Sequence, residues 1–233
     1  MSRKRALVTG VGPGTGTSVV RRFAEGGYDV AMIARNEQRL GKLASEIGHT
    51  KAFPVDVTDA ARFDETLDRI FAHFGPPDVV VHNAVGGVFG NFMQIDPAIL
   101  QRNFQVNVMA LLHLARRVAP AMVEAGSGAI VASGNTSALR GKSNFAGFAP
   151  TKAAQRILAE SIARELGPKG IHVAYVLIDA VIDVPWARAA RPDAPDDFFI
   201  QPADIAGEIW HVVHQPKSAW SFNVEVRPFK EVW

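Results

Sequence analysis

The sequence predicts an α/β protein built on one doubly wound, seven-stranded parallel sheet with helices on both faces. Two observations predict this fold: short, continuously apolar runs alternate with longer segments of helical periodicity, and the first run leads directly into a glycine-rich turn. Strands that are apolar at every position are typical of a parallel sheet covered on both faces. We expect a single domain over residues 1–233, with ligands bound beyond the carboxyl ends of the strands.

The first half of the chain supplies four expected strands and the helices between them. Each expected strand is a short apolar run, such as RALVT, DVAMIA or DVVVHN. These runs lie at residues 5–9, 29–34, 51–55 and 78–83. The longer segments between them have helical periodicity and are expected to be helices at residues 14–26, 37–46 and 60–74.

The second half continues the alternation. Residues 100–125 and 144–167 are expected to form two long helices on either side of a strand at 128–133. The remaining expected elements are strands at 172–178 and 222–226 and a helix at 202–214. Residues 179–201 form the longest irregular piece, and a loop of that length is uncommon unless it is functional or disordered. We interpret it as a substrate lid, with a floppy insertion as the alternative.

Composition excludes several classes of function. Lys and Arg total 25 against 23 Asp and Glu, so the net charge of +2 is too small to indicate nucleic-acid binding. The chain has no cysteine, which excludes disulfides and thiolate chemistry and fits a reducing compartment. The apolar run that follows the basic N-terminus is too short for a signal peptide, and no stretch approaches a membrane span of about 18 apolar residues. His82 and His113 have no metal-ligand partners at suitable spacing, so we expect a cytoplasmic protein without a metal or a membrane partner.

A glycine-rich turn, TGVGPGTG, follows the first expected strand. Glycines at alternate positions let the backbone turn sharply and approach a ligand closely. The helix after the turn presents free N–H groups and the positive end of its dipole, which together favour a pyrophosphate. Plain turn chemistry is the alternative, but a strand before and a helix after favour dinucleotide binding. The residues expected at the pyrophosphate are Gly10, Gly12, Pro13, Gly14, Thr15 and Gly16.

The end of the second expected strand indicates which dinucleotide is bound. A reader of the ribose 2′-hydroxyl would be Asp or Glu, but the chain has Arg35 and Asn36 there and no carboxylate before Glu37. The planar guanidinium of Arg35 suits a phosphate, so NADP(H) is favoured over NAD(H). The alternative is that Arg35 is a solvated loop residue and Asn36 only caps the next helix.

These residues resemble the motifs of the short-chain dehydrogenase/reductase superfamily. The pair Thr9-Gly10, followed by Gly14 and Gly16, is similar to its TG-x-x-x-G-x-G turn, and Lys152 matches the lysine of its Y-x-x-x-K motif. Positions that match its other markers are Asp56, Val57, Asn83, Ala84 and Asn107. The resemblance spans the whole chain and implies a Rossmann fold and an oxidoreductase that uses NADP(H) and a small-molecule substrate. It also implies that Asp56 and Val57 hold the adenine.

The proton-donating residues of that family are replaced in this chain. The resemblance implies a tyrosine four residues before Lys152, but that position holds Phe148, which has no proton to donate. It also implies a serine thirteen positions before the tyrosine, where this chain has Asn135. The only tyrosines, Tyr28 and Tyr175, are expected within strands, so neither is expected to act in its place.

The segment expected around the nicotinamide also departs from the family. The chain reads IDAVIDV at residues 178–184, where the family usually has N-P-G-x-V-x-T. Asp179-Ala180 replaces Pro-Gly and Val184 replaces the threonine, whereas Ile182 stands at the valine position and is an expected cofactor contact.

Three polar residues are candidates for the remaining chemistry. Lys152 is expected to bind ribose hydroxyls, with snorkelling from a helix end as the alternative. Asn135 could donate an amide N–H to a developing oxyanion or could simply shape its loop. Asn107 could hold a catalytic water, as the resemblance implies, or could bridge backbone groups in a helix kink.

Three functions are compatible with these residues. The preferred one is an NADP(H)-dependent oxidoreductase that acts on a small carbonyl or alcohol, with Asn135 polarising the substrate oxygen and Lys152 delivering the proton directly or through water. The second is a degenerate relative that binds NADP(H) as a sensor or scaffold. The third is a reaction in which the tyrosine is dispensable, such as proton transfer or reduction of an enone.

The resemblance also implies self-assembly. Family members commonly pair the two long helices, here expected at 100–125 and 145–166, so a homodimer or homotetramer is expected. An apolar tail with Phe222, Phe229 and Trp233 could lie against a neighbouring subunit or pack on its own domain.

Overall fold

A seven-stranded sheet with every strand parallel to its neighbours forms the centre of the molecule, in a computed structural model that describes residues 3–231. The strand order is β3-β2-β1-β4-β5-β6-β9. The strands are β1 (Lys4–Thr9), β2 (Tyr28–Ala34), β3 (Thr50–Pro54), β4 (Val79–His82), β5 (Gly128–Asn135), β6 (Ile171–Ile178) and β9 (Asn223–Val226). The predicted fold class is confirmed.

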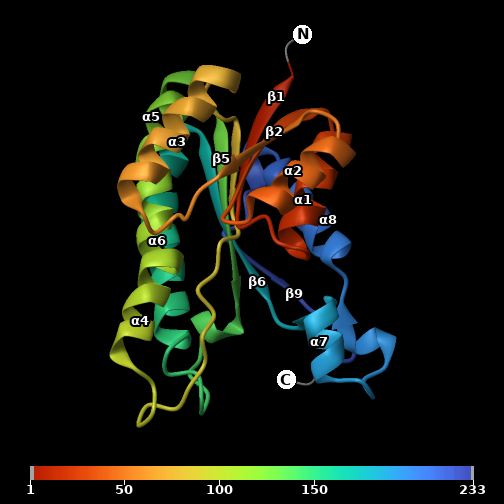
Figure 1. Cartoon of the computed structure of the whole chain (residues 1–233). Helices are drawn as coiled ribbons and strands as arrows, with labels where there is room; N and C mark the ends of the chain where they lie inside the picture. The colour runs from red at the N-terminus through yellow and green to blue at the C-terminus, as the bar shows by residue number, and fades with distance from the viewer. Residues whose placement is uncertain (1–2, 232–233) are drawn as a thin grey trace.

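Helices cover both faces of the sheet, and each face has its own apolar core. On one face lie α3 (Ala60–Phe74), α5 (Ala110–Ala125) and α6 (Ala149–Leu166). On the other lie α1 (Thr15–Glu25), α2 (Glu37–Glu46) and α8 (Pro202–Val213) (Figure 1). Alternate residues of a strand point to opposite faces, so in β1 Leu7 belongs to the first core and Val8 to the second. Burial on both faces explains why the strands read as continuous apolar runs.

The sheet changes winding direction between β1 and β4. The chain moves outward from β1 to β2 and β3 on one side, and then from β4 to β5 and β6 on the other. Because the connections after β1 and β4 leave in opposite directions, a crevice opens beyond the carboxyl ends of these two strands. Thr9 and His82 are paired at this end, which places the glycine-rich turn beside the loop that follows β4.

The helix expected at 100–125 is interrupted. It consists of α4 (Pro97–Phe104), a π-helical turn (Gln105–Met109) and α5. Within this turn, Asn107 bonds through its side chain to both backbone groups of Gly86 and to Thr151. The expectation of one continuous helix was wrong here because the apolar pattern continues across a π turn, whose distortion depends on contacts with distant residues.

The helix expected from residue 144 begins later, at Ala149. Asn144 has a φ of 65°, a left-handed conformation that a helix cannot contain, and Gly90 and Phe145 form an isolated bridge between two loops. Pro150 in the first turn of α6 fits a helix start, because a proline there loses no helical hydrogen bond. Phe148 is therefore the residue that precedes the helix rather than part of its second turn.

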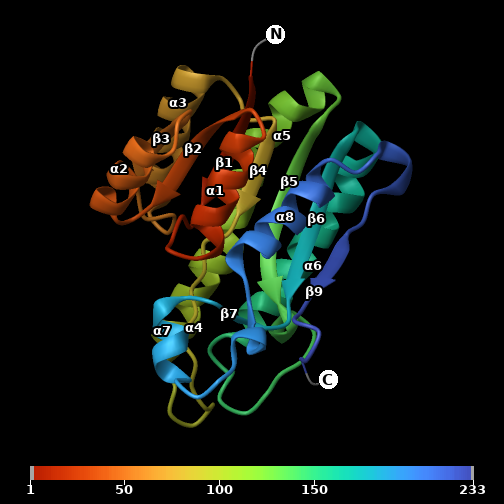
Figure 2. The ribbon, with the colours of Figure 1, turned by 90° about the vertical axis from the view of Figure 1, so that its right-hand side faces the viewer.

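Residues 179–201 contain short strands and helices, which corrects the expectation of an irregular segment, whereas its interpretation as a substrate lid stays a prediction. Two short parallel strands, β7 (Val181–Ile182) and β8 (Phe199–Ile200), flank α7 (Pro185–Ala190). Arg188 holds the segment together, because its Nε and Nη2 donate to the two carboxylate oxygens of Asp183 at 2.7 and 2.8 Å. Figure 2 shows α7 and β7 beyond the carboxyl end of the sheet, where α4 also lies.

One helical stretch, Pro97–Ala125, is long and apolar enough by length and composition alone to cross a membrane, contrary to the sequence expectation. Leu111, Leu114 and Val118 within it are nevertheless fully buried in the core formed with α3, α6 and the sheet. We therefore interpret this stretch as a core helix of the α/β fold.

Candidate active site

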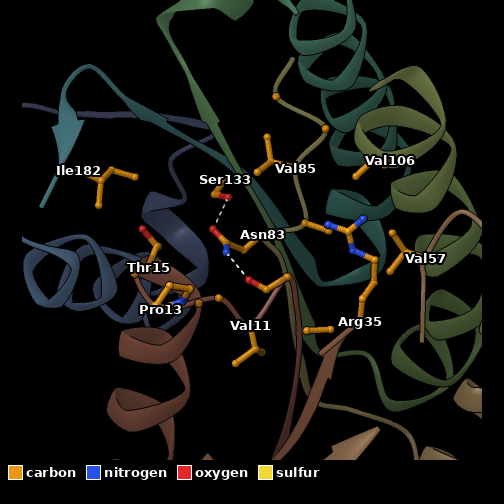
Figure 3. A pocket seen from close by; sticks show the side chains of 18 of the residues that line it. Val11, Pro13, Thr15, Arg35, Val57, Asn83, Val85, Val106, Ser133 and Ile182 are labelled. Carbon is orange, nitrogen blue, oxygen red and sulfur yellow. Dashed lines mark hydrogen bonds between the residues drawn. The ribbon is translucent and has the colours of Figure 1, made fainter. Parts of the chain in front are cut away.

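A cavity of about 950 Å³ opens beyond the carboxyl ends of the central strands. Every residue that the sequence assigned to cofactor binding lines it, from the glycine-rich turn through Arg35 to Ile182. Figure 3 shows Asn83 in the middle, Thr15, Pro13 and Ile182 on one side, and Arg35 and Val57 on the other. Asn135 and Phe148 also line the cavity, whereas Asn107 does not.

The glycine-rich turn lies against the loop that follows β4. Gly10 has a φ of +71°, and a Cβ there would come within 2.4 Å of the backbone nitrogen of Ala84. Only glycine allows both this conformation and this approach. Asn83 fixes the contact, because its Nδ2 donates to the carbonyl of Gly10 at 2.9 Å while its Oδ1 accepts from the Ser133 hydroxyl at 2.8 Å.

The turn and the start of α1 fit a phosphate group. No side chain caps α1, and of its first-turn N–H groups that of Thr17 donates to the Gly12 carbonyl at 3.1 Å. The Oγ1 of Thr15 is buried without a hydrogen-bond partner and lies in the cavity lining. A Cβ on Gly14 would meet the Val184 side chain at 2.8 Å, so this approach is also reserved for glycine. An anion at this point would satisfy the Thr15 hydroxyl and the helix N-terminus together.

The far end of the cavity combines a carboxylate with basic side chains. Asp56 accepts from the backbone N–H of Thr58 at 3.0 Å and from its hydroxyl at 2.8 Å. Burial alone would raise the pKa of Asp56, but the hydrogen bonds from Thr58 and the charges of Arg35 and Arg102 lower it. Asp56 is therefore ionised at neutral pH and its loop is locked by Thr58.

Arg35 is accompanied by a second arginine that sequence reasoning missed. Arg39 lies one helical turn later and also lines the cavity. Among the described residues, neither guanidinium has a hydrogen bond or an ion pair. Asn36 caps α2 by accepting from the backbone N–H of Arg39 at 2.8 Å, as the alternative interpretation of that residue expected. The position of Arg39 in the first turn of α2, beside the end of β2, could have identified it as a second basic residue at this edge of the sheet.

Lys152 is buried, with only 2% of its surface exposed, so it does not snorkel from the helix. Its Nζ donates to the carbonyl of Ser133 at 3.0 Å and to Oε1 of Gln155 at 2.5 Å. Burial lowers the pKa of Lys152 to about 7. The protein itself thus supplies two acceptors for this amine, whereas the sequence interpretation assigned its stabilisation to a ligand alone.

An aromatic ring lies at the position where the sequence resemblance implies a tyrosine. Phe148 is 3% exposed, lines the cavity, and packs against Phe89 with 5.0 Å between ring centroids. Neither tyrosine lines the cavity: the hydroxyl of Tyr28 contacts His214, and the hydroxyl of Tyr175 donates to Gln155. Lys152 is consequently the only titratable residue in the part of the lining formed by β5, α6 and the segment after β6.

The two asparagines have different environments. Asn107 is fully buried, and its side chain bridges the backbone of Gly86, as expected for a residue in a helix kink. Asn135 lines the cavity, and its Oδ1 accepts from the backbone N–H of Ser137 at 3.1 Å. No partner of its Nδ2 is recorded among the described residues, so the amide N–H₂ is available to a ligand.

His82 lies behind the lysine and is fully buried. Its Nδ1 contacts the Thr9 hydroxyl at 3.0 Å, which ties β4 to β1. Burial, together with the charge of Lys152, lowers the pKa of His82 to about 3, so it is neutral under ordinary conditions. No group of three or more His, Cys, Asp or Glu that could hold a metal ion occurs in the range 3–231.

Comparisons with known proteins identify the family and the fold. A family model described as short chain dehydrogenase matches residues 4–193. A solved short-chain dehydrogenase from Rhodopseudomonas palustris is 31% identical, with a TM-score of 0.84 over 98% of this chain and all of that one. A metagenomic short-chain oxidoreductase in complex with NADP is 27% identical, with a TM-score of 0.85 over 98% of both chains. L-xylulose reductase of Mesocricetus auratus is 31% identical over 74% of this chain and 70% of its own length.

Proposed function

The chain belongs to the short-chain dehydrogenase family, and we propose that it is an NADP(H)-dependent oxidoreductase that acts on a small carbonyl or alcohol by a modified proton-transfer route. One observation carries the proposal. The cavity keeps the glycine turn, Asn83 and Lys152, but a phenylalanine ring occupies the position of the family's tyrosine. The chain thus combines an intact nucleotide site with a different source of the proton.

The preference for NADP(H) is supported by Arg35 and Arg39. Two guanidinium groups without ion pairs lie near the start of α2, and no carboxylate stands between β2 and Glu37 to accept from a ribose 2′-hydroxyl. A phosphate at this point would accept charge-assisted hydrogen bonds from both side chains. The NADP complex of the metagenomic relative is consistent with this assignment.

The nicotinamide would exchange a hydride with the substrate carbon, and the protein must then manage the charge on the substrate oxygen. Asn135 would donate its free amide N–H to that oxygen. Lys152 would supply the proton, because a group with a pKa of about 7 is well suited to acid–base catalysis near neutral pH. Asn107 would act only by holding the loop at Gly86, since its side chain is already fully engaged.

The substrate side of the cavity is mainly apolar. Val85, Val88, Phe148, Val184 and Trp186 line it, together with the polar residues Asn103, Ser133, Asn135 and Lys152. Such a surface favours a small carbonyl compound with an apolar body over a charged or heavily hydroxylated one. We propose that residues 179–201, which contribute Val184 and Trp186, close over this substrate.

The second candidate is a degenerate relative that binds NADP(H) as a sensor or scaffold. The observation that favours it is the Phe148 ring, which removes the family's proton donor from an otherwise complete nucleotide site. A sensor would need the phosphate and adenine contacts but no proton donor.

NADPH oxidation across a panel of ketones, quinones and enones separates the two candidates. The proposal expects turnover with at least one apolar carbonyl compound in the wild type and loss of that turnover in Lys152→Ala. Tight NADPH binding without oxidation of any compound, in both the wild type and Phe148→Tyr, would instead establish the sensor.

We also propose a cytoplasmic homodimer or homotetramer. Phe104, Val123 and Ile157 are exposed apolar side chains on the helices that the family pairs. Of the tail, Phe222 packs on its own core and Phe229 is exposed, while Trp233 lies outside the described residues. Light scattering after size exclusion tests the assembly, and a monomer at micromolar concentration would contradict it.

A further inference from the structure

Behind Lys152 lies a closed network of buried polar groups. Oε1 of Gln155 accepts from Lys152 Nζ at 2.5 Å and from the Tyr175 hydroxyl at 3.1 Å. On its other side, Nε2 of Gln155 donates to the main-chain carbonyl of Asn107 at 2.8 Å. Gln155 and Tyr175 are both fully buried. The side chain of Gln155 therefore connects the lysine to the π-helical turn without an intervening water.

The orientation of the Gln155 amide follows from its partners. Its oxygen faces two donors, the Lys152 amine and the Tyr175 hydroxyl, and its NH₂ group faces a carbonyl. The reverse orientation would place an NH₂ group against the Lys152 ammonium and an oxygen against the Asn107 carbonyl, leaving both of these contacts unsatisfied. The network thus has one satisfied arrangement.

A second, independent observation shows that the space for this network is built into the sheet. A Cβ on Gly134 would lie 2.2 Å from the Tyr175 hydroxyl and from two carbons of its ring. Any other residue on β5 at this position would displace Tyr175 and, with it, a donor to Gln155. Three separate segments, β5, β6 and α6, therefore each contribute a residue that the arrangement needs.

We infer that Gln155 is a positioning residue. Its side chain links the Lys152 amine to the Asn107 carbonyl and closes the side of the amine that faces away from the cavity. The amine therefore exchanges its proton only with groups in the cavity. The inference rests on the proposed role of Lys152 in proton transfer and extends it. The family resemblance implies a water at the helix asparagine, on a route from the lysine to solvent. Here an amide side chain takes the contact with that asparagine's carbonyl.

The charges around Lys152 support this role. The recorded acceptors of its amine are both neutral carbonyl oxygens, on Ser133 and Gln155. The titratable groups that face it are His82 on β4, which is neutral, and Tyr175 on β6, whose pKa burial raises. No ion pair of Lys152 with a carboxylate is recorded within residues 3–231. A buried lysine without a counter-charge has a lowered pKa and depends on its dipolar neighbours for position.

Competitive labelling with acetic anhydride tests the inference without requiring turnover. The label reacts only with uncharged amines. The extent of labelling of Lys152, measured by mass spectrometry at a series of pH values, therefore gives the pKa of its amine. The exposed Lys142 in the same chain serves as the internal reference for reagent activity. The experiment compares the wild type with Gln155→Ala and Gln155→Leu, each checked for folding by circular dichroism and thermal melting.

The two variants are expected to shift the pKa of the Lys152 amine in opposite directions. Gln155→Ala leaves room for water behind the lysine. That water solvates the charged amine and raises its pKa by about one unit. Gln155→Leu fills the space without an acceptor, which lowers that pKa by a similar amount. A crystal structure of Gln155→Ala is expected to show a water between Lys152 Nζ and the Asn107 carbonyl.

An unchanged pKa of Lys152 in both variants, or shifts of that pKa in the same direction, would overturn the inference. Should Gln155→Leu fail to fold, Gln155→Met provides the same contrast with a more flexible side chain. This outcome is distinguishable from failure of the proposed function, since an enzyme without turnover can still show the opposite shifts. Conversely, turnover can persist even when Gln155 does not position the lysine.

Discussion

The two halves of the cavity differ in what holds them in shape. The nucleotide half is defined largely by backbone: a left-handed glycine against the loop after β4, an uncapped helix start, and loops tied together by Asn83. The substrate half is defined by a few side chains, chiefly Phe148, Asn135 and Lys152. The residues of the first half match the motifs that the sequence resembles, whereas Phe148 and Asn135 in the second half depart from them.

The comparison teaches that the two halves can change independently. Replacing tyrosine by Phe148 alters neither the glycine turn nor the contacts of Asn83, because no hydrogen bond connects them to that ring. The change does affect Lys152, which in the family acts on the tyrosine. In this chain the lysine is held instead by Ser133 and Gln155. A buried amine needs such partners whatever chemistry it performs.

The largest effect is expected from a substitution in the substrate half alone. Lys152→Ala removes the proposed proton donor, so turnover should fall about 10² to 10⁴-fold. NADPH oxidation with the best carbonyl substrate measures the effect. Lys142→Ala, a change to an exposed lysine outside the cavity lining, is the matched control and should retain full activity. Equal turnover in wild type and Lys152→Ala would remove the lysine from the mechanism.

The second-largest effect is expected from a substitution in the nucleotide half. A methyl group on Gly10 would meet the Ala84 backbone at 2.4 Å, at a φ of +71° that alanine rarely adopts. Gly10→Ala should therefore lose about 100-fold or more in NADPH affinity and about 1 to 3 kcal/mol of folding stability. Fluorescence titration and thermal melting measure the two losses.

Gly12→Ala is the control for this clash. A Cβ there has its nearest neighbour at 4.0 Å, so the melting temperature should be close to that of the wild type. Similar destabilisation by both substitutions would mean that the close approach at Gly10 is not what requires glycine.

The third prediction tests which nucleotide the nucleotide half prefers. Arg35→Ala combined with Arg39→Ala should weaken NADPH binding about 10 to 100-fold, because two charge-assisted contacts with the 2′-phosphate are lost. Binding of NADH, which lacks that phosphate, should change little. Lys42→Ala, on the same helix but outside the cavity lining, should leave both affinities unchanged. Parallel losses for the two nucleotides would contradict a 2′-phosphate site.

The smallest effect concerns pH. Burial lowers the pKa of Lys152 from 10.5 to about 7, so the amine is protonated below that pH and neutral above it. Carbonyl reduction, which consumes a proton, should therefore slow by up to about tenfold per unit as pH rises above 7. Alcohol oxidation should show the opposite trend over the same range. A reduction rate that stays constant from pH 6 to about 9 would show that Lys152 does not donate the proton.

The layered fold could be predicted from sequence because burial on both faces of the sheet produces apolar runs at every strand. The short elements could not. β7 and β8 have two residues each and α7 has six, too few for a periodic pattern to form. The π-helical turn was missed for a related reason: within it Asn107 contacts Gly86 and Thr151, which lie 21 and 44 residues away in the sequence and leave no local pattern.

The candidate site was predictable to the extent that its residues follow strands. Arg35, Asp56 and Asn83 each come just after a strand, so the fold alone places them at one edge of the sheet. Gln155 has no such signal. Its significance depends on Lys152 and on Tyr175 from another strand, and a buried glutamine on a helix is not distinguishable by pattern from an exposed one.

Calorimetric titration of the wild-type protein with NADPH and with NADH tests the central claim most directly. The account predicts a complex of one nucleotide per chain and an affinity for NADPH at least about tenfold above that for NADH. Absence of a complex with either nucleotide at millimolar concentration would contradict it, because each proposal for the substrate half assumes a coenzyme bound beside it.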